Sequence, residues 1–408
     1  MESQAIEISK HTLAIFAALF LAGGIAAKVA DLFKIPDVVL FLLIGILIGP
    51  PGLNLVVVPA ESVLNQFMLI LGASFLLFHG GTSVSFGVLK KTWITLSLLA
   101  TLAVIIMIFI VGFVAQWALG IDLMFAFLLA AVIASTDPAT LVPIFLSIKI
   151  RDKVAQTVLS ESAFNDATGA ICTFAILGMI ATGQVSAGES IMKFFVMAGG
   201  GIAIGIGYGL VSGFIVSNKA KFLFGDYAQV LILPVIIAAY LTSEHFEASG
   251  FMAVFVIGLI YGNLDAFGWH MTKEHHENFE SFLNNGSLLL RMIIFILLGT
   301  HVDFAIVCQY LIPGMIIIGI FMFVARPLAV LACVIFDRRA EWTKKEILFM
   351  FWTRETGVIP AALSGMLIGM GIQYADIIAA ITFMAILATL VIQASTTKWL
   401  AQKLDLLD

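Results

Sequence analysis

Long apolar segments, separated by short clusters of charged residues, proline and glycine, repeat along the whole chain. The 30 residues between Lys91 and Asp122 contain no charged side chain, and a helix of about 20 apolar residues is long enough to cross a bilayer. The pattern predicts thirteen transmembrane helices, approximately at residues 11–31, 36–50, 64–88, 92–119, 122–147, 153–183, 188–218, 226–243, 247–263, 278–302, 305–336, 343–370 and 374–400. The predicted fold class is therefore an all-α polytopic membrane protein.

Composition agrees with this pattern. Of the 408 residues, 61% are hydrophobic and 12% are charged, and the mean hydropathy is +1.09. Soluble domains carry about 25% charged residues, so the lipid bilayer is the expected surrounding. No basic patch alternates with aromatic residues, which argues against nucleic acid as a partner. The three cysteines lie within apolar segments, in no pattern typical of disulfides or of a metal site.

The basic residues predict how the chain is oriented. Sixteen Lys and Arg fall in one set of alternating loops and at the C-terminal end, two fall in the other set, and three lie within spans. Cytoplasmic loops are enriched in Lys and Arg, and thirteen spans put the two termini on opposite sides. We therefore expect a multi-pass protein of the cell membrane, with its N-terminus outside and its C-terminus in the cytoplasm.

Charged residues within the spans are the first candidates for function. They are Asp137, Glu161, Asp166, Arg291, Arg326 and Arg354. A charge in the middle of a bilayer costs at least about 2.5–3.5 kcal/mol, so each is expected to be paired or functional. With a rise of about 1.5 Å per residue, Asp137 lies roughly 18 Å from Lys149, and Asp166 roughly 20 Å from Lys153. Both carboxylates are thus expected near the membrane midplane.

Two spans are expected to be broken. Pro138 disfavours helix at Asp137 and removes a backbone donor, and the polar run at residues 353–357 interrupts the twelfth span. Irregular backbone at this depth is tolerated where it lines an enclosed cavity, and broken helices of opposite direction are typical of inverted repeats with an ion site between them. The alternatives are a proline kink capped by Thr136 and Asp137, and a polar loop at residues 353–357.

The sixth span carries oxygen-bearing side chains at helical spacing. Ser162 and Asp166 are four residues apart and share a face, and Glu161 and Asn165 form an adjacent pair. A hydroxyl and a carboxylate together suit Na⁺, K⁺ or Li⁺, and a proton competes for the same carboxylate. Glu161 and Arg326 lie at depths that allow an ion pair. The structural alternative is a hydrogen-bond cluster between helices.

The sequence Ala134-Ser135-Thr136-Asp137-Pro138-Ala139, followed by Glu161-Ser162-Ala163-Phe164-Asn165-Asp166, resembles the monovalent cation–proton antiporter superfamily in its sodium/proton exchanger branch. The resemblance covers essentially the whole chain. It implies a sodium/proton antiporter fold with inverted repeats and two broken, crossing helices. It also implies a homodimer and elevator-type movement. Core helices are expected at about 64–183 and 278–400, and dimerisation helices at about 11–50 and 188–263.

The resemblance also implies roles for individual residues. Asp166 becomes the principal cation- and proton-binding group, helped by Ser162 and Thr136. Asn165 stands where electrogenic relatives carry a second Asp, which implies electroneutral exchange of one cation for one proton. Glu161 resembles a family glutamate that pairs with an arginine, here Arg326. The positions near the helix crossing are Asp137, Pro138 and Arg354.

The chain departs from the family pattern at one position of interest. His79 stands where many relatives have an acidic residue before glycine, so it is a candidate modulator of selectivity, either as a neutral pore-lining residue or as a proton sensor. Arg291 matches no family role. The chain ends at Asp408, just after the last span, so this sequence contains no cytoplasmic regulatory domain of the kind expected in many relatives. Either the protein lacks one or the sequence is a shortened form.

Several activities remain to be distinguished. Na⁺ is the expected substrate together with H⁺, while Li⁺ and K⁺ stay open because all three take oxygen ligands. A cation-coupled symporter of an organic solute on a similar fold is the main alternative, and a channel is a further one. No phosphate-binding glycine loop, HExxH or GxSxG motif occurs, so neither an enzyme nor a cofactor is expected.

Overall fold

The computed structural model describes residues 2–33, 35–136, 145, 150–183, 187–220 and 223–407. Within these residues nine helices are long and apolar enough to cross a membrane. Four shorter apolar helices, Asp37–Ile48, Leu123–Ile133, Gly250–Tyr261 and Val358–Gly369, account for the other expected spans. The prediction of an all-α polytopic membrane protein is confirmed, because the described residues contain no β-strand and a single isolated β-bridge, Ile150 with Leu407.

The helices of the first half of the chain are α1 (Glu2–Phe33), α2 (Asp37–Ile48), α3 (Val63–Thr82), α4 (Phe86–Ala100), α5 (Leu102–Leu119), α6 (Leu123–Ile133), α8 (Asp152–Thr182), α9 (Ala187–Val216), α10 (Ala228–His245) and α11 (Gly250–Tyr261). Those of the second half are α12 (Lys273–Thr300), α13 (Phe304–Gln309), α14 (Leu311–Ile320), α15 (Arg326–Val334), α16 (Lys344–Trp352), α17 (Val358–Gly369), α18 (Ala375–Ala388) and α19 (Ser395–Lys403).

Helix ends follow local sequence signals. Ser62 begins α3 by accepting a hydrogen bond from the Asn65 backbone N–H. A capping box of Thr343 and Glu346 begins α16, with each side chain bonded to the other residue's backbone N–H. Gly120 follows α5 with a φ of 66°, a conformation that glycine adopts without strain. The charge, proline and glycine clusters in the sequence therefore mark real boundaries.

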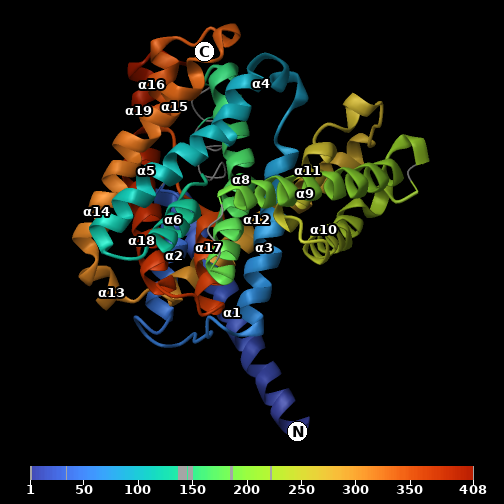
Figure 1. Ribbon diagram of the computed structural model, residues 1–408. Helices are drawn as coiled ribbons and strands as arrows, with labels where there is room; N and C mark the ends of the chain where they lie inside the picture. The colour runs from blue at the N-terminus through green and yellow to red at the C-terminus, as the bar shows by residue number, and fades with distance from the viewer. Residues whose placement is uncertain are drawn as a thin grey trace.

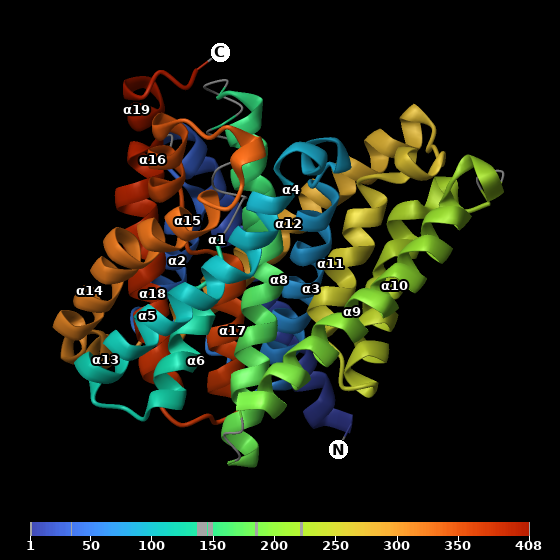
Figure 2. The same cartoon turned by 45° about the horizontal axis from the view of Figure 1, so that its top comes forward.

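The helices form two packing groups with α8, α3 and α12 between them (Figures 1 and 2). On one side α9, α10 and α11 lie together, and on the other α5, α14 and α18. Helix α3 packs most extensively on α11, and α12 packs most extensively on α2, whereas α8 packs mainly on α4 and α6. Helix α8 thus packs more on α4 and α6 than on α3.

Small residues allow α3 and α12 to approach their partners closely. A Cβ added at Gly258 of α11 would lie 2.0 Å from the Phe78 carbonyl oxygen of α3. A Cβ added at Gly299 of α12 would lie 2.5 Å from the Leu42 carbonyl oxygen of α2. Both distances are shorter than any side chain tolerates, so backbone contact requires glycine at these positions. Such small-residue contacts are typical of helix packing in membranes.

Both expected interruptions fall where helices end. Helix α6 ends at Ile133, before Asp137 and Pro138, which lie outside the described residues. The expected span at residues 343–370 is divided into α16 and α17 by a non-helical segment at residues 353–357, so the second predicted break is confirmed. Two other spans contain π-helical turns, η4 (Phe321–Ala325) before Arg326 and η6 (Thr389–Ala394) between α18 and α19. Such turns are rare in proteins, and those that occur are often found at functional sites.

Candidate functional site

Four polar side chains of α8 lie within two helical turns of each other, in the interior of the protein. They are Glu161, Ser162, Asn165 and Asp166, and their exposed fractions are 2%, 1%, 0% and 7%. Spacings of one, three and four residues place them on one side of the helix. The spacing argument made from the sequence therefore corresponds to a buried polar face on α8, and Asp166 is the most accessible of its members.

Thr136 joins this face from the end of α6. Its backbone N–H donates to Asn165 Oδ1 at 2.9 Å, and Asn165 Nδ2 donates to Thr136 Oγ1 at 2.9 Å. The Thr136 hydroxyl in turn donates to Ser162 Oγ at 2.8 Å. Because α6 has already ended at Ile133, the Thr136 N–H is available to the Asn165 side chain. The amide of Asn165 thus holds the unwound segment against α8.

Glu161 and Arg326 form a bidentate ion pair. Arg326 Nη2 donates to Glu161 Oε2 at 2.9 Å, and Arg326 Nη1 donates to Glu161 Oε1. Arg326 Nε donates to the Met350 carbonyl at 3.0 Å, near the end of α16. Arg326 is completely buried. Bidentate pairing with a carboxylate is the strongest arrangement a guanidinium makes, so this pair fixes α8, α15 and α16 relative to one another.

Arg354 connects the two interrupted spans. It lies in the segment between α16 and α17, is 1% exposed, and donates from Nη2 to the Ala134 carbonyl at the end of α6. Its guanidinium carbon lies 4.9 Å from the centre of the Phe321 ring. A helix C-terminus carries partial negative charge, so the position of Arg354 suits the end of α6.

Sequence reasoning did not select Glu355 or Thr356. Glu355 is completely buried in the same break, and the Thr356 N–H donates to Thr389 Oγ1 of η6 at 3.1 Å. The sequence did contain a signal for both residues, because they belong to the polar run at residues 353–357 within an apolar span. From that run, only Arg354 was proposed as a functional residue. Thr389 gave no signal, because a single threonine in an apolar helix is common.

His79 and Arg291 both find partners away from α8. His79 Nδ1 and Ser287 Oγ of α12 share a hydrogen bond of 2.6 Å. Arg291 Nη2 donates to Asp37 Oδ2 at 2.7 Å, at the beginning of α2. The structure thus gives Arg291 the partner that the sequence did not reveal.

The site offers hydroxyl, amide and carboxylate oxygens in a protein interior. Such ligands suit a hard cation without redox chemistry, and one carboxylate makes the site sensitive to protons. In the part of the chain that the structure describes, no three His, Cys, Asp or Glu residues are grouped as transition-metal ligands. The arrangement can therefore bind a monovalent cation or a proton at Asp166.

Comparisons with known proteins agree with this chemistry. A family model described as "Sodium/hydrogen exchanger, transmembrane" matches residues 15–403. The chain is 31% identical to the probable Na(+)/H(+) antiporter 2 of Methanocaldococcus jannaschii, with 94% of each chain covered. It is 28% identical to the K(+)/H(+) antiporter NhaP of Alkalimonas amylolytica, covering 88% of this chain and 61% of that protein. The solved structure of the sodium proton antiporter MjNhaP1 from M. jannaschii at pH 8 matches with a TM-score of 0.85 and 30% identity, covering 98% and 99% of the two chains.

Proposed function

The chain belongs to the sodium/hydrogen exchanger family, and from this premise we propose that it is a secondary active antiporter that exchanges Na⁺ for H⁺. The observation that carries the proposal is the buried oxygen cluster of Thr136, Ser162 and Asn165 beside Asp166. A buried carboxylate among neutral oxygens is a place where a cation and a proton exclude each other. An ionisable residue in the membrane interior is a functional candidate by default.

The exchange reaction needs one titratable group. The ionised carboxylate of Asp166 binds Na⁺, while Ser162 Oγ and Thr136 Oγ1 replace part of the hydration shell. Protonation of Asp166 removes its charge and releases the cation. Because the same group binds either ion but not both, inward movement of one is coupled to outward movement of the other. Asp137, which the structure does not describe, remains a proposed member of the site.

The charges around Asp166 support an electroneutral exchange. Asn165 is neutral and is engaged with Thr136, and Glu161 is neutralised by Arg326. Neither adjacent side chain then contributes a second exchangeable proton. One Na⁺ therefore replaces one H⁺, and no net charge crosses the membrane in a cycle.

Alternating access requires one group of helices to move against another. We place α4, α5, α6, α8 and α14–α19 in the moving core. The sequence assigned residues 64–88 and 278–302 to the core, but their closest packing is on α11 and α2, so we place α3 and α12 with the dimerisation helices. The facing surfaces of α3 and α17 meet partly through small and apolar groups, such as Gly365 against Leu69, and one weak hydrogen bond of 3.4 Å joins Gln66 Nε2 to the Gly365 carbonyl. Few polar contacts of this kind suit an elevator-type sliding movement.

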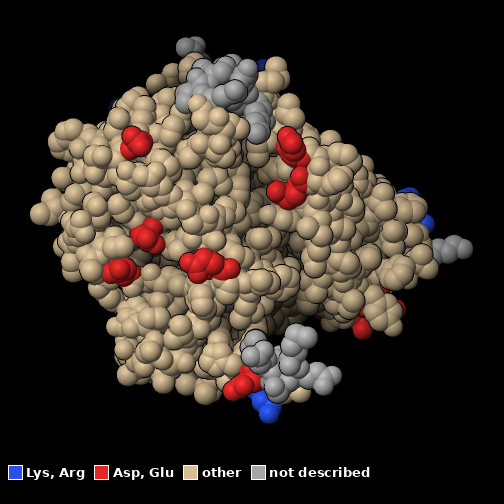
Figure 3. Space-filling view, turned by 60° about the horizontal axis from the view of Figure 1, so that its bottom comes forward, with Lys and Arg blue, Asp and Glu red and all other residues tan. Residues whose placement is uncertain are grey.

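We further propose a homodimer in the cell membrane, with the C-terminus in the cytoplasm. The two ends of the chain lie at opposite ends of the molecule (Figure 1). On the face away from the C-terminus, Asp and Glu are seen across the surface, and Lys and Arg only toward its margin (Figure 3). A shortage of basic residues on the outer face agrees with the preference of Lys and Arg for the cytoplasmic side.

A transport assay tests the proposal directly. The purified protein is placed in proteoliposomes with an internal proton-sensitive dye and titrated with Na⁺, Li⁺ and K⁺ across pH. Exchange predicts proton movement driven by the cation gradient with no organic solute present. A cation current at equal pH on both sides would instead identify a channel, and a requirement for an organic solute would identify a symporter.

K⁺/H⁺ exchange is a second candidate. Two observations favour it: one relative bears the name K(+)/H(+) antiporter, and His79 stands where an acidic residue was expected. Both ions take oxygen ligands, so their selectivity depends on the size of the cavity. In the same assay, a lower KM for K⁺ than for Na⁺ would decide for this candidate.

A further inference from the structure

The core and the dimerisation helices touch at the end of the molecule away from the C-terminus. Helix α3 begins there, after the non-helical segment at residues 49–62, and α17 ends there at Gly369 (Figures 1 and 2). The two helices pack on each other, although we place α3 with the dimerisation helices and α17 in the moving core. We call residues 58–60 of the non-helical segment the outer segment.

The outer segment is fixed to the dimerisation helices by three side chains. Asn65 Nδ2 and Gln66 Nε2 of α3 both donate to the Ala60 carbonyl at 2.9 Å. His301, at the end of α12, is bonded through Nε2 to the Val58 carbonyl at 2.7 Å. Because a carbonyl oxygen only accepts, Nε2 carries the proton. The outer segment is therefore held from α3 and from α12, and we expect it to remain with them when the core moves.

Helix α17 meets the outer segment through two glycines. Gly365 and Gly369 are four residues apart and share a face of the helix. A Cβ added at Gly369 would lie 2.6 Å from the Ala60 carbonyl oxygen and 1.8 Å from Gln66 Nε2. A Cβ added at Gly365 would lie 2.8 Å from Leu69 Cδ1. The end of α17 thus lies against the outer segment with no space for a methyl group.

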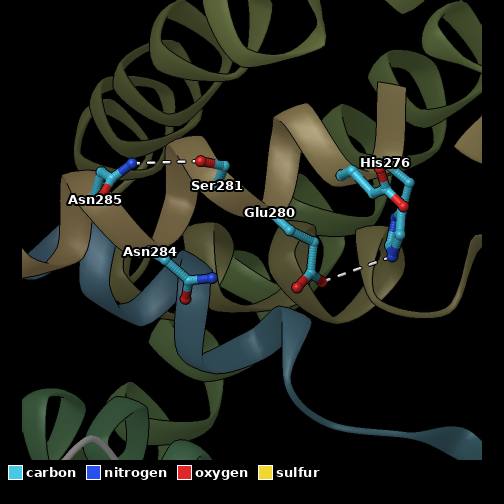
Figure 4. A pocket seen from close by; sticks show the side chains of 6 residues that line it. His276, Glu280, Ser281, Asn284 and Asn285 are labelled. Atoms are coloured by element: carbon cyan, nitrogen blue, oxygen red, sulfur yellow. Dashed lines mark hydrogen bonds and ion pairs between the residues drawn. The ribbon is translucent and has the colours of Figure 1, made fainter. Parts of the chain in front are cut away.

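The approach is less close toward the opposite end of α3. A Cβ added at Gly80 would lie 3.7 Å from Ala163 Cβ of α8, which is an ordinary contact. At the corresponding end of α12, a cavity of about 420 Å³ is lined by exposed polar side chains such as His276 and Glu280 (Figure 4). The tight contact between α17 and the dimerisation helices therefore lies at the outer end in this structure.

We propose that Ala60 and Gln66 on one side, and Gly365 and Gly369 on the other, form the outer gate of the transporter. Closed as in this structure, the gate separates Asp166 from the outer medium, and it opens when the core moves. The inference rests on the antiport function proposed above, because exchange without leak requires that the ion site is never open to both sides at once.

The contacts across the gate suit a contact that must separate in every cycle. The hydrogen bond from Gln66 Nε2 to the Gly365 carbonyl is 3.4 Å long and therefore weak. Gly369 lets the helix come into direct contact with the Ala60 carbonyl, so the gate closes by backbone fit and not by strong bonds. A small movement of packed helices is enough to open such a contact.

Gly369→Ala tests the gate. Gly369 is helical, and alanine favours a helix more than glycine does, so the backbone itself tolerates the change. The end of the Gln66 side chain can move away from the added methyl group, but the fixed Ala60 carbonyl cannot. We therefore expect the variant to close incompletely and to populate the form that is open to the outside.

Thiol labelling measures this opening. The reporter is Leu69→Cys, at a position on α3 that is 2% exposed and lies one turn beyond Gln66. The background is Cys308→Ser, because Cys308 is exposed while Cys172 and Cys333 are buried. A membrane-impermeant methanethiosulfonate is added on the outer side.

We expect Gly369→Ala to raise the labelling rate of the reporter about tenfold, because the open form becomes more populated. The control is Gly319→Ala on α14, where an added Cβ meets nothing within 4 Å, and it should leave the rate unchanged. An unchanged rate in Gly369→Ala, or an equal rise in Gly319→Ala, would overturn the gate.

Gln66→Ala is a second variant, which decides the question if Gly369→Ala does not fold. It removes the bond across the gate and one of the two side-chain donors to Ala60. We expect the labelling rate to rise about two- to threefold. A rate equal to that of the parent would contradict a closing role for Gln66.

Transport distinguishes a gate from a packing contact that only stabilises the fold. In right-side-out vesicles, Gly369→Ala should lower the KM for outer Na⁺ about two- to threefold and also lower kcat. The open form binds outer Na⁺ more readily but returns to the closed form more slowly. A lower kcat with an unchanged or higher outer KM would indicate a structural role and overturn the gate. Labelling does not depend on exchange, so a parent that labels normally but exchanges no Na⁺ would refute the proposed function and not the gate.

Discussion

Two carboxylates five residues apart on α8 have different surroundings. Glu161 is held by both terminal nitrogens of Arg326, whose own Nε is bound to a backbone carbonyl. Asp166 follows Asn165 in sequence, lies one helical turn after Ser162, and is the more exposed of the two carboxylates. A charge that is permanently compensated stabilises a fold, whereas a charge beside neutral oxygens is suited to exchange its partner. We therefore propose that the same helix carries a fixed charge at Glu161 and an exchangeable one at Asp166.

The largest expected effect comes from removing the exchangeable charge. Asp166→Asn preserves the size of the side chain but has no charge to bind Na⁺ and no proton to release. We expect exchange to be abolished in the dye assay, while the protein elutes and melts like the wild type.

The matched control is Asp376→Asn, the same substitution at an exposed position in the first turn of α18. It should leave exchange unchanged. Turnover like that of the wild type in Asp166→Asn would show that another group binds the ions, and the contrast between the two carboxylates would be wrong.

Removing the fixed charge should act on stability. Arg326→Ala leaves Glu161 buried without its partner, and breaking a buried pair costs about 3–5 kcal/mol. Glu161→Gln leaves the opposite charge, Arg326, uncompensated. We expect a large fall in the melting temperature of both variants, measured by intrinsic fluorescence in detergent.

The double variant Glu161→Gln with Arg326→Ala sharpens this prediction. It leaves no uncompensated charge, so it should be more stable than the sum of the two single effects implies. A normal melting temperature in Arg326→Ala would contradict the structural role of the pair.

The two carboxylates on α8 also show which features of the site could be predicted from the sequence. Residues four apart on one helix share a face, so the pairing of Ser162 with Asp166, and of Glu161 with Asn165 beside it, followed from spacing alone. The thirteen spans and the break at residues 353–357 followed from apolar length and polar interruption. These properties are local, and a helix of known period determines them.

Contacts between side chains on different helices could not be predicted in this way. Ser287 is 208 residues from His79, and Asp37 is 254 residues from Arg291. Their contacts depend on the tilt and rotation of α3, α2 and α12, which apolar periodicity does not determine. Glu161 and Arg326 were paired in advance because a buried carboxylate and a buried arginine each required a partner at similar depth. Ser287 and Thr389 carry no charge that needs a partner, so nothing in the sequence indicated their contacts.

A third prediction tests the neutral neighbour of Asp166. The wild-type exchange rate should not respond to a clamped membrane potential. Asn165→Asp adds a second carboxylate and replaces the Nδ2 donor that holds Thr136. We expect the remaining exchange to become dependent on the potential, measured with K⁺ and valinomycin.

Asn165→Ser is the control, because it removes the same donor without adding charge. It should be slower but still independent of the potential. A potential-dependent wild type would contradict the one-for-one exchange, and an Asn165→Asp variant that stays independent would assign the stoichiometry to another residue.

The smallest effect is expected at a second ion pair, which provides the natural comparison for Glu161 and Arg326. The Asp37 and Arg291 side chains are 26% and 15% exposed, and a single hydrogen bond joins them. Asp37→Asn is the same change, carboxylate to amide, as Glu161→Gln. Because both side chains are partly exposed and a single hydrogen bond joins them, we expect a loss of only about 1 kcal/mol, with exchange retained. Melting temperatures of the two variants, measured side by side, give the comparison. If Asp37→Asn lowered the melting temperature as much as Glu161→Gln, burial would not be what distinguishes the two pairs.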